Sequence, residues 1–197
     1  MIIKRIFDII FSFAGLILLL PVFILVALII KTTTPGPVFF RQIRIGYNAQ
    51  PFTIYKFRSM RVNTSNVSIT LSNDERITPF GRFLRQTKLD ELPQLFNIIK
   101  GDMSVVGPRP DVPGYSDKLS GEDQLIWTVK PGLTGLDSLT YPDEQIILDK
   151  QEDPQQYYDE VLWPAKVAIN VEYVKNHTMM LDFKIIFRTI FRKWENP

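Results

Sequence analysis

Two carboxylates stand side by side at Asp90 and Glu91, inside the run Leu89-Asp-Glu-Leu-Pro93. Apolar residues follow at the spacing of one helix face: Leu92, Leu95, Phe96 and Ile99. This pattern predicts a helix that begins near Asp90, with Asp90 as its N-cap, Pro93 in the first turn and a stop at Gly101. A carboxylate at that position meets the positive end of the helix dipole. An ordinary N-cap in a solvated loop is the alternative interpretation.

Cations lie on both sides of this pair in the sequence: Lys56, Arg58, Arg82, Arg85, Lys88 and Arg109. Arg109 stands between two prolines in Gly107-Pro-Arg-Pro110, which hold the backbone extended and stiff. A stiff arginine is well suited to bind a phosphate in a fixed geometry. A surface turn with a solvated arginine would show the same residues.

Charge and composition narrow the chemistry further. The chain has 197 residues, enough for one or two small domains, and a net charge of only +2. Residues 41–109 hold 11 Lys/Arg and 5 Asp/Glu, whereas residues 110–178 hold 5 and 13, which favours an anionic ligand on the first block. With no cysteine and one histidine, disulfides, zinc sites and a Ser/His/Asp triad are disfavoured. A hard cation bound by carboxylates, Mg²⁺ or Ca²⁺, remains compatible.

An apolar segment near the N-terminus is long enough to insert into a membrane, which would bring the charged residues close to the membrane surface. Ile9 to Ile30 contains no charge, and as a straight helix it would be roughly 33 Å long, about the thickness of a bilayer core. Pro21 interrupts it and predicts a kink. The chain then either crosses the membrane or re-enters on the same face. Hydropathy favours crossing. The charges do not distinguish the two topologies, because both flanks of the segment are basic. Asp8 is expected to pair with Arg5.

The remaining elements follow from shorter patterns. Residues 38–57 read as a β-hairpin with a turn at 46–48, and residues 61–74 as a polar loop. Thr78 and Pro79 begin a short helix whose inner face is Phe80, Phe83, Leu84 and Thr87. Residues 153–176 predict a helix interrupted near Pro164. A final helix, 180–194, carries a basic stripe of Lys184, Arg188 and Arg192 beside an apolar face, which suits either a membrane interface or a globular core.

Several motifs together resemble the bacterial sugar transferase family, the monotopic phosphoglycosyl transferases in their minimal form. In chain order they are Lys4-Arg-x-x-Asp8, the proline-broken apolar segment, Tyr55-Lys-Phe-Arg-Ser-Met60, Leu89-Asp-Glu-Leu-Pro-Gln-Leu-Phe-Asn97, Lys100-Gly-Asp-Met-Ser104, Gly107-Pro-Arg-Pro110 and Lys130-Pro-Gly-Leu-Thr-Gly135. The resemblance covers nearly the whole chain. Two places depart from it: Leu20 precedes Pro21 where serine is common, and residues 136–144 lack the usual basic residue, which leaves the donor sugar open.

The resemblance implies an activity. The family transfers a sugar-1-phosphate from a UDP-sugar to undecaprenyl phosphate, releases UMP, and uses Mg²⁺. By resemblance, Asp90 is the nucleophile, forms an aspartyl-phosphosugar and binds the metal, and Glu91 is its acid/base or acceptor-placing partner. Lys56, Arg58, Arg85 and Arg109 are the predicted phosphate ligands. Cations are needed because the reaction joins two polyanions. A membrane-anchored scaffold and a metal-dependent phosphohydrolase are the alternatives.

Chemistry then decides the topology. The UDP-sugar is cytoplasmic, so a spanning helix with its basic N-terminus inside would strand the site on the wrong face. We therefore predict a helix-dominated α+β fold with three parts: a re-entrant membrane helix-break-helix at 1–33 with its break at Pro21, a catalytic domain at 34–178 that contains the small β-hairpin, and a basic amphipathic interfacial helix at 179–197. The expected location is the cytoplasmic face of the bacterial inner membrane. No nucleic-acid partner is expected, and whether the protein forms a homo-oligomer is left open.

Overall fold

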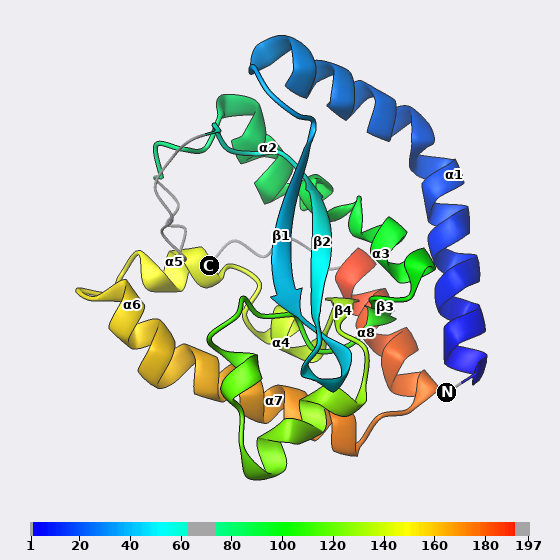
Figure 1. The fold of residues 1–197 in the computed structure, drawn as a ribbon, viewed down its shortest axis with the longest axis vertical. Coiled ribbons are helices and arrows are strands. Elements are labelled where there is room, and N and C mark those ends of the chain that lie inside the picture. Colours follow the sequence, from blue (N-terminus) through cyan, green and yellow to red (C-terminus); the bar gives the residue numbers. More distant parts are fainter. Residues whose placement is uncertain (1, 63–73, 192–197) are drawn as a thin grey trace.

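The structure is a computed structural model that describes residues 2–62 and 74–191. A long helix, α1 (Ile2–Thr33), runs up one side of the molecule and bends across its top (Figure 1). A two-stranded hairpin, β1 (Phe39–Ile45) and β2 (Pro51–Phe57), stands in the middle of the view. Helices α7 (Trp163–Lys175) and α8 (Met179–Phe191) cover the lower and rear parts. Both termini of the described chain therefore lie on the same body.

Short elements fill the rest of the described chain. In order they are α2 (Pro79–Gln86), a 3₁₀ turn at Leu89–Glu91, α3 (Gln94–Lys100), β3 (Ser104–Val106), 3₁₀ turns at Ser116–Lys118 and Gly121–Thr128, β4 (Gly132–Thr134), α4 (Leu136–Thr140), α5 (Glu144–Leu148), α6 (Pro154–Tyr157) and a π turn at Tyr158–Leu162. β3 pairs with β4 in parallel, and β1 pairs with β2 in antiparallel fashion. The prediction of a helix-dominated α+β fold with a small hairpin is confirmed.

The hairpin has the predicted place and a tight register. Phe39 faces Phe57 at one end and Ile45 faces Pro51 at the other. The connection is a 3₁₀ turn at Tyr47–Ala49 in which Asn48 has a φ of 53° and Ala49 a φ of 56°, left-handed backbone that asparagine adopts more readily than most residues. The local sequence pattern was sufficient to predict the hairpin, because the turn residues and the alternating apolar residues both favour the same structure.

Helix α1 differs from the prediction in one respect. It continues as a single helix through Pro21, so no interruption of the chain marks the predicted helix-break-helix. Figure 1 shows the change of direction as a bend of a continuous ribbon, which is what proline produces when neighbouring contacts hold the helix on both sides. Among the described residues, α1 is the one helix long and apolar enough to cross a membrane.

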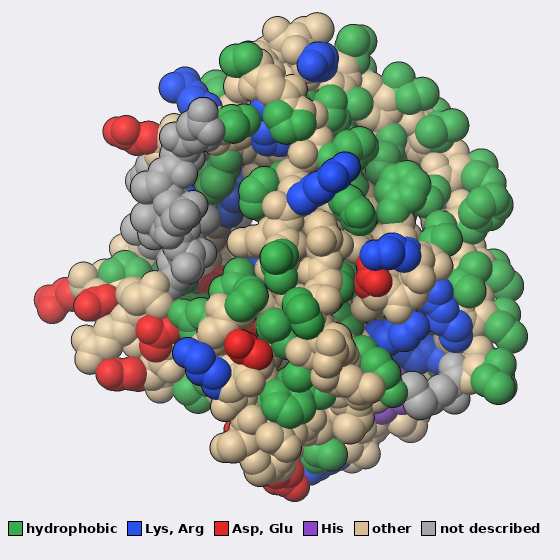
Figure 2. Space-filling model, viewed as in Figure 1, with side chains coloured by type: hydrophobic (Ala, Val, Ile, Leu, Met, Phe, Trp, Pro, Cys, Tyr) green, Lys and Arg blue, Asp and Glu red, His purple; other side chains and the backbone are tan. Residues whose placement is uncertain are grey.

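One stripe of α1 packs against the body along its whole length. The buried residues of this stripe are Asp8, Ser12, Phe23, Val26 and Ile30. The opposite face is apolar and exposed, with Leu18 at 79% and Leu28 at 60%. In Figure 2 hydrophobic side chains accordingly gather over the outer side of α1. An apolar surface of this size, unpaired by protein, is typical of a membrane contact.

The N-terminal end of α1 is held by polar contacts that the sequence did not predict. Asp8 accepts hydrogen bonds from Ser104 Oγ and from the Val105 backbone N–H, each at 3.0 Å. Arg5 instead donates to the carbonyl oxygens of Ile98 at 2.6 Å and Ile99 at 2.9 Å, at the end of α3. The expected pair of Asp8 with Arg5 is therefore wrong. Each of these side chains binds the body instead of its neighbour on the helix.

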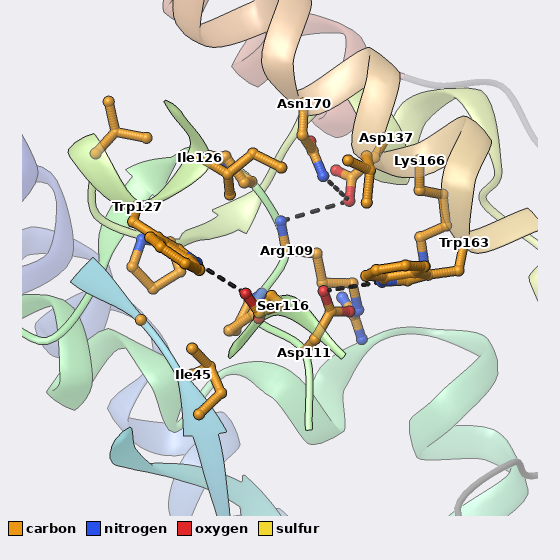
Figure 3. Close-up of a pocket in the computed structure, with 16 residues that line it drawn as sticks. Ile45, Arg109, Asp111, Ser116, Ile126, Trp127, Asp137, Trp163, Lys166 and Asn170 are labelled. Carbon is orange, nitrogen blue, oxygen red and sulfur yellow. Dashed lines mark hydrogen bonds between the residues drawn. The ribbon is translucent and has the colours of Figure 1, made fainter. Parts of the chain in front are cut away.

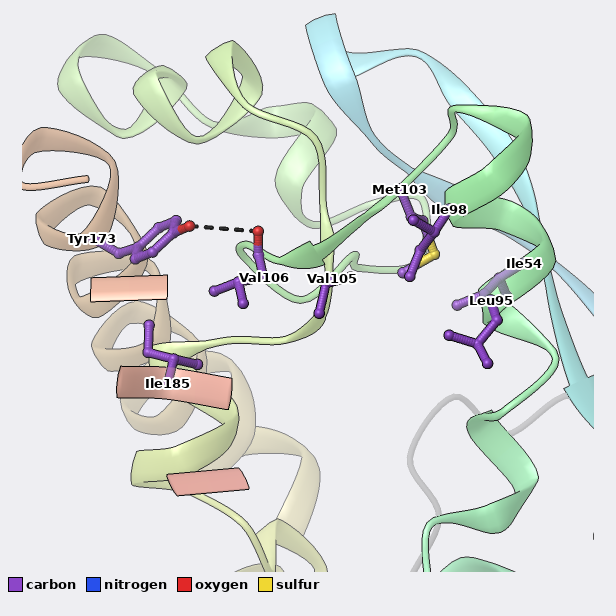
Figure 4. Packing of buried hydrophobic residues seen from close by; sticks show 8 residues of the cluster. All are labelled: Ile54, Leu95, Ile98, Met103, Val105, Val106, Tyr173 and Ile185. Atoms are coloured by element: carbon purple, nitrogen blue, oxygen red, sulfur yellow. Dashed lines mark hydrogen bonds between the residues drawn. The ribbon is translucent and has the colours of Figure 1, made fainter. Parts of the chain in front are cut away.

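Within the described residues, three buried clusters make up the core. The largest joins β2, α3, β3, α7 and α8, and consists of Ile54, Leu95, Ile98, Met103, Val105, Val106, Tyr173 and Ile185 (Figure 4). A second places the later half of α1 against the end of β2 and α2, through Phe23, Val26, Ile30, Phe57 and Leu84. A third lies under α7 and includes Leu119, Val167 and Val171. Because both of the first two clusters include residues of β2, and Leu89 and Leu92 pack against the second, they fix the hairpin and the carboxylate turn to one another.

Two local predictions about helix ends need correction. Asp90 is not an N-cap: it lies inside the 3₁₀ turn, and Pro93 occupies the residue before α3. Lys88, with a φ of 57°, redirects the chain into that turn. In α2 the Thr78 cap is confirmed, since its hydroxyl accepts from Gly81 N–H at 2.9 Å. Phe83 is 49% exposed, however, so only part of the predicted inner face is buried.

The C-terminal helices agree with their patterns. The predicted interruption near Pro164 is the π turn before α7, which leaves this proline in the first helical turn, where its missing N–H is tolerated. Helix α8 buries Asp182 and Ile185 and exposes Phe183, Phe187 and Ile190. The predicted contributions of Arg192 and Trp194, like residues 63–73 of the polar loop, lie outside the described residues.

Candidate active site

Glu91 is the charged centre of the site. Its carboxylate accepts from Lys56 Nζ at 2.7 Å and from Arg109 Nη2 at 2.6 Å, both on Oε1, and from Arg109 Nη1 at 3.3 Å on Oε2. Burial by itself would raise the pKa of Glu91, but the nearby charges of Arg109 and Lys56 lower it well below its usual value. Glu91 is therefore held ionised, with both oxygens engaged by cations.

Asp90 lies one residue earlier, and its surroundings differ from those of Glu91. It is 7% exposed, and its Oδ1 is buried without a hydrogen-bond partner in the described part of the chain. Burial and the neighbouring charge of Glu91 raise the pKa of Asp90, and Lys56, Arg85 and Lys88 partly offset that rise. A buried carboxylate oxygen without a partner is unusual, since most buried polar atoms are satisfied. It is an available nucleophile or metal ligand.

The cations around these carboxylates are partly buried, with the Lys56 side chain 16% and the Arg109 side chain 37% exposed. Burial lowers the pKa of Lys56, and Glu91 partly restores it. The charge of Glu91 raises the pKa of Arg109 above its ordinary value, despite burial. Burial also lowers the pKa of Arg85, and the charge of Asp90 is the largest influence that raises it. Cations in a low-dielectric setting interact strongly with any anion that enters.

Arg44 on β1 joins the cluster, although sequence reasoning missed it. Its Nη1 donates to Pro110 O at 3.1 Å, and burial together with the charge of Arg109 lowers its pKa. The adjacent Ile45 N–H donates to Asp111 O at 2.9 Å. The alternation of the strand puts Arg44 on the same face as Gln42, which accepts from its guanidinium at 2.7 Å. That alternation was the available signal, but it does not show which face meets the carboxylates.

Five of the seven predicted site residues come together and two, Arg58 and Pro21, do not. Lys56, Asp90, Glu91 and Arg109 form the cluster, with Arg85 beside Asp90. Arg58 donates instead to backbone carbonyl oxygens at the end of α1, so its phosphate-binding role stays a prediction. Pro21 lies inside α1 and is not among the residues that line the cleft with the carboxylates.

Two motif loops hold Arg109 in place. Residues 107–110 leave β3, and residues 130–135 contain its parallel partner β4. The backbones approach so closely that a Cβ on Gly107 would lie 2.4 Å from Lys130 O, and one on Gly132 would lie 2.2 Å from Gly107 N. The glycines of the second loop therefore serve backbone packing. They support Arg109 indirectly, by fixing the loop that carries it.

A small cavity with both apolar and polar lining residues adjoins Arg109 (Figure 3). Asp137, 1% exposed, accepts from Arg109 N–H at 3.4 Å and from Asn170 Nδ2 at 3.3 Å, and it lies at the start of α4. Trp163 Nε1 donates to Asp111 at 3.3 Å on the other wall. Sequence reasoning placed no role on Asp137 or Asn170, because their partners are 28 and 33 residues distant in the chain.

The site opens into a wide cleft. Asp90, Glu91 and Arg109 line it together with Lys166 and Tyr158, and the cleft continues to apolar residues of α1, among them Phe11 and Leu18. One open surface thus joins the carboxylates to the apolar helix. A ligand with an anionic head and an apolar tail would contact both ends of it.

The site offers few carboxylate ligands for a metal ion. Within the described residues no group of three or more acidic or histidine side chains converges on one point. Mg²⁺ does not require one, because it commonly binds one or two carboxylates and takes its other ligands from water and substrate phosphates. The unpartnered oxygen of Asp90 fits that pattern, whereas Glu91 is occupied by cations.

The structure thus shows a cluster of carboxylates and cations in a cleft that adjoins an apolar helix. Residues 1–196 match the family model described as bacterial sugar transferase. The chain belongs to the bacterial sugar transferase family.

Curated relatives share this likeness. A UDP-glucose:undecaprenyl-phosphate glucose-1-phosphate transferase of Klebsiella pneumoniae is 41% identical over 202 residues, which cover 100% of this chain and 41% of that protein. A protein of the same name from Escherichia coli (strain K12) is 38% identical over 199 residues, 98% of this chain and 40% of the relative. The exopolysaccharide production protein PSS of Rhizobium leguminosarum bv. phaseoli is 38% identical, with 96% and 94% covered. This chain thus spans about two fifths of the first two relatives and nearly all of the third.

Proposed function

We propose that this protein transfers a sugar-1-phosphate from a UDP-sugar to undecaprenyl phosphate and releases UMP, as the first step in assembling an exopolysaccharide or related glycan. The names of its relatives support the substrates. The single observation that carries the proposal is the contrast within one turn: Glu91 is bound by two cations, while the Oδ1 atom of its neighbour Asp90 has no partner in the described chain.

The proposed reaction runs in two displacements. A carboxylate oxygen of Asp90 attacks the phosphorus next to the sugar, the bond from that phosphorus to the UMP oxygen breaks, and UMP leaves with the bonding electrons. An oxygen of the lipid phosphate then attacks the same phosphorus, and the bond to Asp90 breaks. The carboxylate is regenerated and the product is a lipid diphosphate-sugar. Covalent catalysis of this kind replaces one difficult transfer by two easier ones.

The surrounding charges suit both displacements. Lys56, Arg85 and Arg109 are the proposed phosphate ligands, with Arg44 next to Arg109. They offset the negative charge of two substrates that would otherwise repel each other and the carboxylates. Glu91, held by Lys56 and Arg109, keeps these two cations at fixed positions. Asp90 would hold Mg²⁺, and the ion would supply charge neutralisation on the substrate phosphates.

We also propose that α1 enters and leaves the membrane on one face. Both of its ends bind the same body: Arg5 binds carbonyl oxygens of α3, and Arg58 binds those of residues 34 and 35 just after the helix. A helix that crossed a bilayer would have one end beyond reach of that body. The proposed position is the cytoplasmic face of the bacterial inner membrane, where a UDP-sugar is available.

Helix α8 is proposed to lie in the membrane interface beside α1. Phe183 of α8 contacts Phe7 of α1 edge-to-face, with ring centroids 5.3 Å apart. Phe187, Ile190 and Phe191 are each more than 60% exposed on the same helix. An exposed aromatic face that continues the surface of an apolar helix, with Lys184 and Arg188 beside it, suits the boundary of an anionic bilayer.

The direct test of activity uses membranes that contain the protein, undecaprenyl phosphate and a panel of UDP-sugars. Release of UMP with one donor, lost by at least about a thousandfold in Asp90→Asn, is the expected result. Full activity in Asp90→Asn would exclude the nucleophile, and an unaffected phenotype in both Asp90→Asn and Glu91→Gln would favour a scaffold. Release of free sugar phosphate without a lipid acceptor would favour a phosphohydrolase.

Topology has its own test, because the chain contains no cysteine. Ile3→Cys near the start of α1 and Lys118→Cys on the catalytic body each introduce a single reactive thiol. Both are expected to react with an impermeant reagent from the same side of sealed vesicles. Reaction from opposite sides would reject re-entry.

A further inference from the structure

Arg58 makes a pair of contacts that no phosphate-binding role requires. Its Nη1 donates to Pro35 O at 2.6 Å and its Nη2 donates to Thr34 O at 2.8 Å. The side chain is almost fully buried, with the residue 6% exposed. These two oxygens belong to the segment that leaves the C-terminal end of α1, where helix carbonyl groups lack intrahelical partners and attract a cation.

Gly36 is shaped to this contact. It has a φ of +118°, which L side chains rarely adopt, and a Cβ atom there would lie 2.2 Å from Nη1 of Arg58. The chain after α1 therefore passes over the guanidinium with no room for a side chain. The run Thr34-Pro-Gly-Pro37 contains both carbonyl oxygens that accept hydrogen bonds from Arg58.

The contact lies at a junction of three parts of the molecule. Two residues before Arg58, Lys56 binds Glu91 at 2.7 Å. One residue after it, Ser59 O accepts from Thr78 N–H at 3.0 Å, at the start of the helix that carries Arg85. Residues 56–59 thus connect the carboxylate turn, the exit of α1 and the beginning of α2.

We propose that Arg58 is a positioning residue that clamps the exit of α1 to the end of β2, so that the apolar part of the cleft stays aligned with Asp90 and delivers a lipid-linked phosphate to it. This rests on the proposed transferase function. The cleft supports the proposal, since Leu18 and Leu19 of α1, Arg58 and Asp90 all line it. Arg58 acts through the position of α1 and touches neither substrate.

The test compares three variants in reconstituted vesicles. Arg58→Lys keeps a positive charge but replaces a planar fork with a single ammonium that cannot bind both oxygens in the same way. Gly36→Ala keeps the arginine at position 58, but its new Cβ atom would push the guanidinium away from the two carbonyl oxygens. Lys31→Ala is the matched control, because it removes an exposed positive charge at the same end of α1. The KM values for donor and for lipid acceptor are measured separately.

We expect Arg58→Lys and Gly36→Ala to raise the acceptor KM by about tenfold and to leave the donor KM within about twofold, with Lys31→Ala unchanged. A raised donor KM in Arg58→Lys with a silent Gly36→Ala would overturn the proposal and return Arg58 to the phosphate ligands. An unchanged acceptor KM in both variants would overturn it as well.

A second measurement separates this proposal from the transferase itself. Thermal unfolding of Arg58→Ala, Gly36→Ala and the double variant forms a cycle that needs no substrate. If the two residues form one clamp, the double variant loses less in Tm than the sum of the single variants. Additive losses would overturn the clamp whatever the activity, whereas absence of UMP release with a coupled cycle would count against the transferase alone.

Discussion

Two buried aspartates in different regions of this molecule are satisfied to different degrees. At the joint of α1, α7 and α8, Asp182 accepts from Tyr173 OH at 2.7 Å on one oxygen, and lies 2.6 Å from Lys4 Nζ and 3.0 Å from His177 Nε2 on the other. In the carboxylate turn, Oδ1 of Asp90 has no partner within the described residues. Both oxygens of Asp182 are thus hydrogen-bonded, whereas one oxygen of Asp90 is not bonded within the described chain.

We propose that this difference separates a carboxylate that serves structure, Asp182, from one that serves chemistry, Asp90. A fully satisfied carboxylate stabilises the position of its partners, and its loss leaves them unpaired. An unsatisfied one costs stability in the free protein and gains its partners when an anion-bound metal or an electrophile arrives. Strain of this kind is expected where selection favours function over stability.

The largest expected effect is on stability at the joint. Asp182→Ala leaves the Lys4 ammonium, whose side chain is 18% exposed, without its carboxylate partner. We expect a loss of about 3–5 kcal/mol in the free energy of unfolding, since breaking one half of a buried pair leaves an uncompensated charge. Denaturant unfolding in detergent measures it. A loss no larger than that of a surface substitution would break the comparison.

Glu91→Gln should have a smaller effect of the same sign. It removes the charge that holds Lys56 and Arg109, with a loss of about 1–3 kcal/mol. The pKa of Glu91 is lowered in the folded state, so its contribution is present above the unfolded carboxyl pKa and is lost as pH falls through the lower folded value. The stability difference between wild type and Glu91→Gln should therefore persist at neutral pH and vanish in strong acid.

Asp90→Asn should act in the opposite direction on stability. Burial and Glu91 raise the pKa of Asp90 in the folded state, so its contribution to stability is fully present below the unfolded pKa and is lost as pH rises through the raised folded value. At neutral pH the substitution removes a buried charge with an unpaired oxygen, and we expect a gain of about 1 kcal/mol. A lower Tm in Asp90→Asn would show that this carboxylate is structural after all.

The smallest expected effect is a shift in the pH dependence of the rate, which reports the electrostatic coupling between the two carboxylates. Because the charge of Glu91 raises the pKa of Asp90, the acid limb of the pH–rate profile for UMP formation should lie above the usual carboxyl range. In Glu91→Gln this limb should move to lower pH, since the like charge is gone and Lys56 is released toward Asp90. Single-turnover UMP release on the residual activity measures the limb. An unmoved limb would assign it to another group.

Much of the fold was predictable because local signals agreed with one another. The hairpin, the Thr78 cap, the interruption near Pro164 and α8 each rest on contacts close in sequence. The turn that carries Asp90 was mispredicted, because Lys88 adopts left-handed backbone and starts a 3₁₀ turn that the apolar periodicity of α3 does not reveal. Tertiary packing of the turn outweighed the preference for an N-cap there.

The site was predictable in its residue types and less so in its contacts. Lys56, Glu91 and Arg109 meet as the motifs suggest, although 35 and 18 residues separate the paired positions. Arg58 looked equivalent to Lys56 in the sequence, yet the two side chains bind different parts of the molecule. Only the path of the chain after α1, including Gly36, distinguishes them.

The central claim concerns the covalent step on Asp90, and intact-protein mass spectrometry tests it most directly. Wild-type protein is incubated with the UDP-sugar that supports turnover, without lipid acceptor, and quenched rapidly. The account predicts a mass increase equal to one sugar phosphate less one water, mapped to the peptide that contains Asp90 and absent in Asp90→Asn, together with a matching burst of UMP. Turnover that requires both substrates to be bound at once, with no adduct and no burst, would contradict it.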